Sequence, residues 1–169
     1  VRTIREHLKP HHEVFIVEMG AKQRGDIKEI CDLVSPEIGI VTSVGEMHLE
    51  TFGSVESVAR TKFELIDALP EGGFGIVNID SEAAARYIAD NAIKVHSYAV
   101  EAAEADYCAV DIQYGSAETR FGVAKREGLD EGYATHILGR GNLLNITAAL
   151  AVAEYMGVSL ESRRRAVRQ

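Results

Sequence analysis

The fold of this chain is decided by the stretch IGIVTSVGEMHLETFGS, residues 38–54. It begins with a short apolar run, Ile38–Thr42, which is typical of a strand buried on both faces. A loop rich in Gly, Glu and His follows, and Ser54 then offers a side-chain oxygen that can cap a helix. A doubly buried strand followed by a loop and a helix predicts one unit of a parallel sheet.

Similar units lie on both sides of this stretch. In chain order we expect a strand over Val14–Val17, a helix over Asp26–Leu33, the strand Ile38–Thr42, a helix from Ser54 to about Leu69, a strand over Phe74–Val77, and a helix over Ser81–Asn91 capped by Asp80. Three strand–helix units in succession indicate an α/β fold with a doubly wound, mostly parallel sheet flanked by helices.

The second half of the chain has a different pattern. Short polar turns separate three strand patterns, which predict a small antiparallel portion of sheet over Tyr107–Tyr114, Thr119–Ala124 and Tyr133–Leu138. A helix over Leu143–Met156, ended by Gly157, and a last helix after Ser159 complete the expected order. We expect residues 1–169 to form a single domain. Because the chain starts without Met and stops inside a helix pattern, we also expect it to be a fragment of a larger protein.

Composition and charge exclude several classes of function. Hydrophobic residues make up 46% of the chain and charged residues 26%, which is ordinary for a folded protein. The net charge of −8 gives no general attraction to nucleic acid or to an anionic membrane. No apolar run approaches the ~20 residues of a membrane span. The two cysteines have no metal-binding spacing and are compatible with a reducing cytoplasm.

Two polar residues follow predicted strands and are candidate metal ligands. Glu18 comes directly after Val17, and His48 lies in the loop that follows the second predicted strand. The carboxyl ends of parallel strands are where ligands bind, so a carboxylate and an imidazole there can converge on a cation. Taken singly, each residue has an ordinary alternative: a solvated loop acid or helix cap for Glu18, and a hydrogen-bonded loop histidine for His48.

Lys62 is the residue whose type fits its position least well. The apolar residues of the helix that follows Ser54 form one stripe, and Lys62 lies in the middle of it. A lysine there must extend its ammonium to water, pair with an acid, or take part in chemistry, because an unpaired buried ammonium is costly. The position therefore marks Lys62 as a candidate functional residue beside Glu18 and His48.

Phosphate and nucleotide binding need other residues. The run GAKQRG, residues 20–25, starts like a phosphate-binding loop, but Asp26 and Ile27 stand where Lys and Ser or Thr are required, so the chain carries no such loop. Asn142 and Asn145 lie three residues apart in a predicted helix and therefore share one face. An asparagine amide can pair with the edge of adenine. Asn142 could equally be an ordinary helix cap.

Taken together, these segments resemble the Mur ligase superfamily, ATP-dependent enzymes that assemble the peptide of peptidoglycan. The resemblance covers nearly the whole chain and rests on five motifs: VEMG with GDI (residues 17–20 and 25–27), GEMHLExFGS (45–54), VAxxKxE (58–64), NxD (78–80) and GRxNxxNxxAA (139–149). The HLExFGS motif followed by its lysine is most similar to the branch that adds D-alanyl-D-alanine.

The resemblance implies roles for individual residues. Glu18 and His48 would be Mg²⁺ ligands, and Lys62 would be carbamylated by CO₂, which turns a cation into an anion with oxygen ligands for Mg²⁺. Asn142 and Asn145 would lie at the adenine of ATP, with Arg140 as a further nucleotide-binding residue. Gly141 departs from the histidine that the family often has at this position.

The resemblance also implies a reaction. ATP would activate the terminal carboxylate of a UDP-N-acetylmuramoyl-tripeptide as an acyl phosphate, and D-alanyl-D-alanine would attack it. The phosphate loop and the N- and C-terminal domains that hold these substrates would lie outside this chain, so the fragment alone should be inactive. We expect no nucleic-acid partner, no membrane insertion, and a bacterial cytoplasmic location.

Three alternatives remain open on the sequence. The chain could come from another Mur ligase or a folylpolyglutamate synthase, which share the fold and metal chemistry. It could be a non-catalytic interaction module with the same fold. A metallohydrolase using His11, His12, Glu18 and His48 is a third reading, but adjacent histidines on a strand point to opposite sides and chelate poorly.

Overall fold

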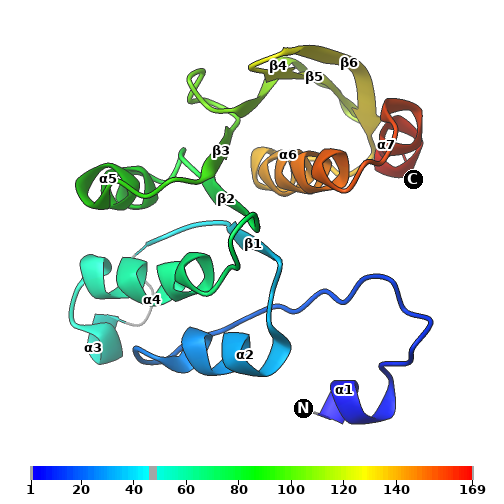
Figure 1. Ribbon diagram of the computed structural model, residues 1–169. Helices are drawn as coiled ribbons and strands as arrows, with labels where there is room; N and C mark the ends of the chain where they lie inside the picture. Colours follow the sequence, from blue (N-terminus) through cyan, green and yellow to red (C-terminus); the bar gives the residue numbers. More distant parts are fainter. Residues whose placement is uncertain (1, 46–48, 169) are drawn as a thin grey trace.

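The computed structural model describes residues 2–45 and 49–168, in which each of the first three strands follows one or two helices (Figure 1). The helices are α1 (Arg2–Glu6), α2 (Asp26–Val34), α3 (Leu49–Phe52), α4 (Val55–Asp67), α5 (Glu82–Asn91), α6 (Arg140–Tyr155) and α7 (Leu160–Val167). The strands are β1 (Ile38–Val41), β2 (Phe74–Asn78), β3 (His96–Ala99), β4 (Tyr107–Tyr114), β5 (Thr119–Lys125) and β6 (Gly128–Thr135).

These strands form one sheet and lie side by side in the order β1-β2-β3-β4-β5-β6. Neighbours from β1 to β4 are parallel. The pairs β4–β5 and β5–β6 are antiparallel. The predicted α/β fold, a mostly parallel sheet with a small antiparallel portion, is therefore confirmed.

The central strand β2 shows why its sequence is a continuous apolar run. Ile76 and Val77 are both 0% exposed, although their side chains point to opposite faces of the sheet. Val77 packs in one cluster with Phe63 of α4 and Ala84 of α5. Ile76 packs in another cluster with Leu144 of α6. Helices thus cover β2 on both faces, which is the doubly wound arrangement (Figure 1).

Helix α4 begins where the sequence predicts. The Ser54 side chain accepts a hydrogen bond from the backbone N–H of Ser57 at 3.1 Å, as expected of an N-cap residue. Val58, Ala59 and Phe63 form the buried face of the helix and pack against β1 and β2. This packing places α4 beside the carboxyl end of β1.

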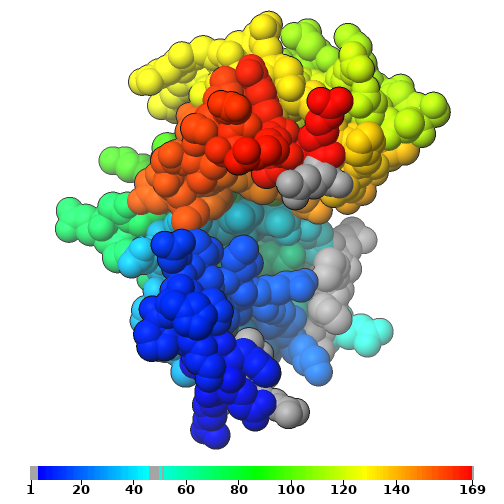
Figure 2. All heavy atoms as spheres, turned by 90° about the vertical axis from the view of Figure 1, so that its right-hand side faces the viewer, coloured from blue at the N-terminus to red at the C-terminus, as the bar shows by residue number. Residues whose placement is uncertain are grey.

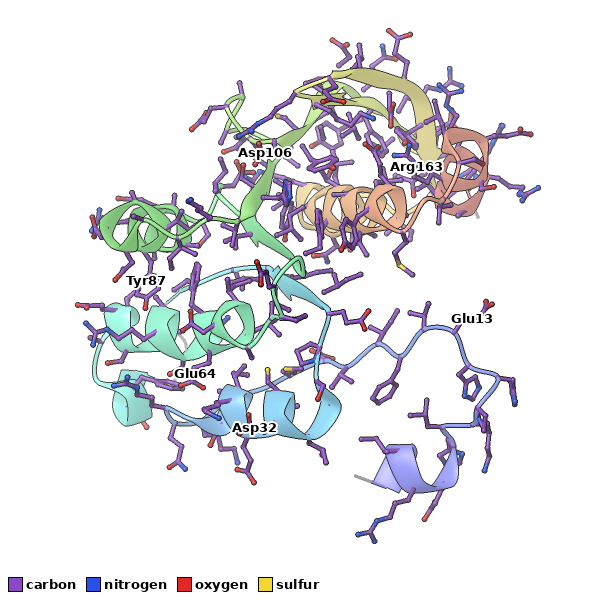
Figure 3. The ribbon with its side chains drawn as sticks, in the orientation of Figure 1. Glu13, Asp32, Glu64, Tyr87, Asp106 and Arg163 are labelled. Atoms are coloured by element: carbon purple, nitrogen blue, oxygen red, sulfur yellow. The ribbon has the colours of Figure 1, made fainter. Side chains whose placement is uncertain are left out.

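The antiparallel strands cover α6 and α7 at the other end of the molecule (Figure 1), where Figure 3 labels Arg163. Four charged side chains meet there. Lys125 Nζ lies 3.1 Å from an Asp130 oxygen and 2.8 Å from Glu154 Oε2. Arg163 Nη1 lies 3.0 Å from the other Asp130 oxygen and 2.6 Å from the same Glu154 oxygen. We call these four residues the buried charge cluster, and it ties both helices to β5 and β6.

The predicted strand over Val14–Val17 is wrong. This segment has no regular secondary structure, and Val14, Phe15 and Ile16 are 52%, 40% and 88% exposed. A strand requires hydrogen bonds to a neighbour, and none of the described strands pairs with this segment. An apolar run alone therefore did not suffice to make a strand.

One strand was not predicted and two elements have other boundaries. The strand that the sequence did not predict is β3, whose four residues, HSYA, lack the apolar run of β1 and β2. Strand β6 begins at Gly128, earlier than the predicted Tyr133, because a tight turn joins it to β5 and pairs Gly128 with Lys125. Helix α6 begins at Arg140 and not at Leu143, since Gly139 takes the N-cap position with a φ of +98°.

None of the described helices is long and apolar enough to cross a membrane.

In the view of Figure 2 the N-terminal residues, coloured blue, lie below the orange and red residues of α6 and α7. Between the N-terminal segment and β1 lies the groove that contains the candidate site.

Candidate active site

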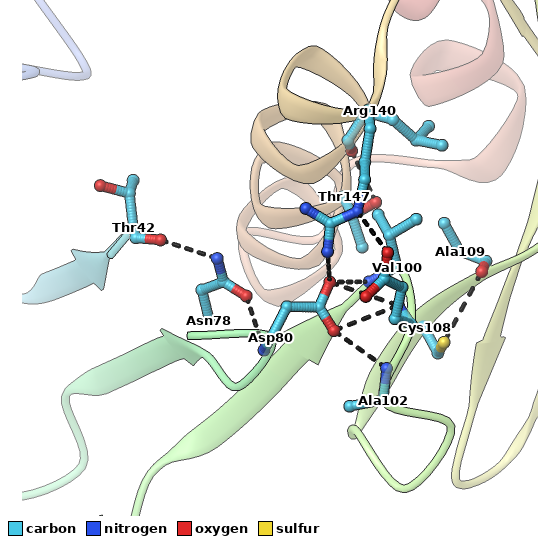
Figure 4. Close-up of polar contacts among 11 residues, drawn as sticks. Thr42, Asn78, Asp80, Val100, Ala102, Cys108, Ala109, Arg140 and Thr147 are labelled. Carbon is cyan, nitrogen blue, oxygen red and sulfur yellow. Dashed lines mark hydrogen bonds and ion pairs between the residues drawn. The ribbon is translucent and has the colours of Figure 1, made fainter. Parts of the chain in front are cut away.

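Side chains link the ends of the parallel strands into what we call the carboxyl edge, residues 42–44, 78–81 and 100–102. Asn78 Nδ2 donates to the Thr42 carbonyl at 2.8 Å, which joins the end of β2 to the end of β1 (Figure 4). Ser81 Oγ accepts from the Val44 N–H at 3.1 Å and donates to the Val44 carbonyl at 3.0 Å. Ligands of parallel α/β sheets bind outside this edge.

Lys62 reaches the carboxyl edge from α4. Its ammonium donates to the backbone carbonyl of Ser43 at 2.6 Å, and its side chain is half-buried. Among the described residues no carboxylate lies within ion-pair distance of Nζ. Burial accordingly lowers the pKa of the Lys62 ammonium below its ordinary value. The position of Lys62 in the apolar stripe therefore brings its ammonium to the strand ends, where its partner among the described residues is a backbone carbonyl.

Glu18 and Lys62 line the same groove. The groove has a volume of about 960 Å³ and runs between the segment Glu13–Ala21 and strand β1, with Ser43 also in its wall. Glu18 is exposed there. The structure thus brings the predicted acid and lysine to one groove, even though the segment that carries Glu18 is not a strand.

His48 lies outside the described residues, so its predicted metal role stays a prediction. The loop before it is held in place as far as Val44 by the two hydrogen bonds to Ser81. Within the described ranges no group of three or more His, Cys, Asp or Glu side chains could hold a metal ion. Glu18 is thus the one predicted metal ligand that needs no modification and lies within the described residues.

Glu64, which follows Lys62 in the VAxxKxE motif, has a defined structural role. Its carboxylate accepts hydrogen bonds from the backbone N–H groups of Gly25 at 2.8 Å and Lys28 at 3.0 Å. These groups belong to the start of α2, where helix N–H groups have no partner within the helix. Glu64 therefore connects α4 to the start of α2, a role that no local sequence pattern reveals because the two residues it binds are 36 and 39 positions away.

Asp80 has a different role from the predicted one. Ser81, and not Asp80, is the N-cap residue of α5. The Asp80 carboxylate, whose side chain is 2% exposed, accepts hydrogen bonds from the backbone N–H groups of Val100, Glu101 and Ala102 at 2.9–3.1 Å (Figure 4). The prediction of a cap is wrong because the side chain turns toward the end of β3, where three backbone donors converge on it.

Arg140 connects Asp80 to α6. Its Nη2 lies 3.0 Å from an Asp80 oxygen, and its Nε lies 2.8 Å from Glu101 Oε1. The first residue of α6 is thereby joined to the residues that follow β2 and β3. The helix start and the strand ends consequently lie at the same edge of the sheet (Figure 4).

Asn142 and Asn145 lie on the exposed side of the first turns of α6. Asn142 is not an N-cap residue, because Gly139 holds that position. Its Nδ2 donates instead to the Leu138 carbonyl at 2.8 Å. Both residues are exposed on the helix whose first residue, Arg140, contacts the carboxyl edge, and this exposure is compatible with the predicted nucleotide contact.

Comparisons with known proteins agree with this arrangement. Residues 1–153 match the family model described as the Mur ligase middle domain. The chain therefore belongs to the Mur ligase middle domain family. The resemblance predicted from the five motifs is confirmed.

Two related enzymes and one crystal structure are similar to this chain over most of its length. The chain is 31% identical over 156 residues to UDP-N-acetylmuramoyl-tripeptide–D-alanyl-D-alanine ligase of Escherichia coli (strain K12), covering 92% of this chain and 34% of that protein. It is 28% identical over 155 residues to the enzyme of the same name from Bacillus subtilis (strain 168), covering 88% of this chain and 31% of that protein. The crystal structure of MurF from Acinetobacter baumannii superposes with a TM-score of 0.82 at 26% identity, covering 96% of this chain and 35% of that one. The chain thus spans about a third of the length of these relatives.

Proposed function

We propose that this chain is the central domain of an ATP-dependent ligase that joins D-alanyl-D-alanine to UDP-N-acetylmuramoyl-tripeptide. The observation that carries the proposal is Lys62, a half-buried lysine that meets a carbonyl and no described acid at the carboxyl edge. The names of the similar ligases from E. coli and B. subtilis supply the substrate class. Such a ligase consumes a soluble nucleotide, so we place it in the bacterial cytoplasm.

In the proposed reaction the tripeptide carboxylate attacks the γ-phosphorus of ATP and ADP leaves. The amine of D-alanyl-D-alanine then attacks the carbon of the acyl phosphate, and phosphate leaves as the amide forms. Glu18, His48 and a carbamate on Lys62 would hold Mg²⁺, which would supply positive charge beside the transferring phosphoryl group. Asn142 and Asn145 would orient the nucleotide from the start of α6.

Carbamylation of Lys62 is a finer part of the proposal. The neutral amine attacks CO₂, a C–N bond forms, and one proton is released to solvent. Burial lowers the pKa of Lys62, which increases the neutral fraction that can react. The modified nitrogen keeps one N–H and can still donate to the Ser43 carbonyl, so the observed contact is compatible with the carbamate.

The proposal is tested by Lys62→Ala in the complete protein that carries this chain. Amide formation from ATP, UDP-N-acetylmuramoyl-tripeptide and D-alanyl-D-alanine is expected to fall by about 100-fold or more, as when a charge-stabilising group is removed. Added bicarbonate should not restore it. Lys28→Ala, which removes an exposed lysine paired with Asp32, is the matched control and should leave turnover unchanged. Wild-type turnover by Lys62→Ala would contradict the proposal.

Carbamylation is tested separately by ¹³C NMR of the protein in ¹³C-labelled bicarbonate. A carbamate resonance should be present in the wild type and in Lys28→Ala, and absent in Lys62→Ala. An active wild type without this resonance would contradict the carbamate alone and leave the ligase assignment standing. The 169-residue chain by itself should release no phosphate from ATP with Mg²⁺, and measurable release would contradict the need for a separate phosphate loop.

A further inference from the structure

Asp80 is a buried carboxylate whose hydrogen-bonding capacity is used by one short segment and one arginine. Its side chain is 2% exposed. One oxygen accepts from Glu101 and Ala102, and the other accepts from Val100 and from Arg140 Nη2. The backbone donors hold the segment that leaves β3, and Arg140 compensates the remaining charge.

The same contacts decide where α6 begins relative to the sheet. Arg140 is the first residue of α6 and binds Asp80 and Glu101 from two adjacent strand ends. Asn142 lies in the same first turn of α6 as Arg140, and Asn145 lies in the next turn. The Asn142 amide has a local contact to the Leu138 carbonyl. Their position relative to the carboxyl edge therefore depends on the Arg140 ion pair and on the packing of Leu143 and Leu144 beneath them.

We propose that Asp80 and Arg140 are positioning residues for nucleotide binding and that Arg140 acts through Asp80 without touching the nucleotide. This inference rests on the proposed ligase function. If Arg140 turned toward a nucleotide, it would leave the buried Asp80 carboxylate without its cation, which is unfavourable at low exposure. The ion pair instead keeps the two asparagines at a constant distance from the ends of β2 and β3.

The first experiment measures nucleotide binding by calorimetry in the complete protein. Arg140→Ala is expected to weaken ATP, ADP and adenosine by the same factor, about tenfold, because a displaced helix start affects the adenine end of each. The KM for ATP should rise while kcat at saturating ATP stays within about twofold of the wild type. A loss much larger for ATP than for adenosine would indicate direct phosphate contact and overturn the inference.

The second experiment is a double-mutant cycle with Asp80→Asn. If Arg140 acts through Asp80, then Arg140→Ala in the Asp80→Asn background should weaken ATP binding by less than about twofold more. Additive losses would show that Arg140 acts independently of Asp80 and overturn the inference. Arg140→Lys, which keeps a cation beside Asp80, covers the case in which Asp80→Asn does not fold. Arg140→Lys should retain most of the wild-type affinity for ATP. A loss of affinity equal to that of Arg140→Ala would overturn the inference.

Hydrogen exchange separates positioning from general unfolding. In Arg140→Ala the amides of residues 100–102 should stay protected, because Asp80 still accepts them. Loss of that protection would mean a structural role only and would overturn the inference.

Arg86→Ala, which removes an exposed i,i+4 ion pair on α5, is the control for the binding measurements and should leave nucleotide affinity unchanged. A wild type that binds no ATP would overturn the proposed function and this inference together, whereas ATP binding unaffected by Arg140→Ala would overturn this inference alone.

Discussion

Two partly buried lysines, Lys62 at the carboxyl edge and Lys125 in the buried charge cluster, have opposite surroundings. Lys125 lies 3.1 Å from Asp130 and 2.8 Å from Glu154, whereas Lys62 donates to the carbonyl of Ser43. Burial acts to lower the pKa of both ammonium groups. For Lys125 this effect is outweighed by the hydrogen bonds that the ammonium donates to Glu154 and Asp130, so its pKa is raised. For Lys62 burial acts alone and the pKa falls.

The difference separates a structural cation from a reactive one. A lysine with two carboxylate partners stays protonated and holds its elements together. A lysine that is desolvated without an acid partner has a larger neutral fraction, and the neutral amine is the nucleophilic form. Mutation of Lys62 at the carboxyl edge should therefore change mainly activity. Mutation of the buried charge cluster should change mainly the free energy of unfolding.

The largest effect on stability is expected from Arg163→Met. Arg163 is 8% exposed and contacts both Asp130 and Glu154, so its removal leaves two carboxylates with Lys125 as their one cation within the cluster. The free energy of unfolding should fall by about 3 kcal/mol, measured by urea denaturation. Arg165→Met on the exposed side of the same helix is the control and should change it by less than about 0.5 kcal/mol. Equal effects would show that the cluster does not stabilise the protein.

The two lysines can be compared directly by changing each to Met. Lys125→Met should lower the free energy of unfolding by about 1–2 kcal/mol at pH 7, because Asp130 and Glu154 keep Arg163 as a partner. Lys62→Met should change it by less than about 0.5 kcal/mol, since the lost carbonyl contact is offset by removal of a desolvated charge. A destabilisation of Lys62→Met as large as that of Lys125→Met would remove the distinction between the two sites.

The pH dependence of the Lys125 contribution has a definite sign. Its pKa is raised above the ordinary value of 10.5, so the folded protein holds the proton more tightly than the unfolded chain does. The stabilisation is complete below pH 10.5 and is lost as the pH rises through the folded-state pKa. The difference between the wild type and Lys125→Met should therefore shrink only in strongly alkaline solution, as measured by urea denaturation at increasing pH. A difference that shrinks below pH 9 would contradict the raised pKa.

Amine reactivity tests the same comparison under milder conditions. Between about pH 8 and 9, Lys62 should react with a small acylating reagent faster than Lys28, followed residue by residue by mass spectrometry. Hydrogen bonding to Asp32 raises the pKa of Lys28, whereas burial lowers that of Lys62. Lys28 is the more accessible of the two, so exposure alone predicts the reverse order, and that order would contradict the pKa difference.

Sequence reasoning was most reliable where one periodic pattern decided the outcome. The strand over Ile38–Val41 and the cap at Ser54 depend on local patterns, and the apolar stripe of α4 brought Lys62 to the carboxyl edge. The predicted strand over Val14–Val17 is wrong because a strand needs a neighbouring strand to pair with, and an apolar run alone does not supply one. The predicted helix cap at Asp80 is wrong because its actual partners, Val100–Ala102 and Arg140, are distant in the chain, and no local pattern reports them. The NxD motif marked the residue but could not reveal what it binds.

The smallest effects are expected from two buried tyrosines that extend the comparison. Tyr133 donates to Asp130 of the buried charge cluster at 3.4 Å, whereas the Tyr98 hydroxyl, near Asp80, has no hydrogen-bond partner among the described residues. Tyr133→Phe should lower the free energy of unfolding by about 1 kcal/mol. Tyr98→Phe should change it by less than about 0.5 kcal/mol or raise it slightly, because a buried hydroxyl without a partner costs free energy. A clear destabilisation by Tyr98→Phe in urea denaturation would show that its hydroxyl has a partner, such as a bound water at the carboxyl edge, and would extend the polar network of Asp80 into the core.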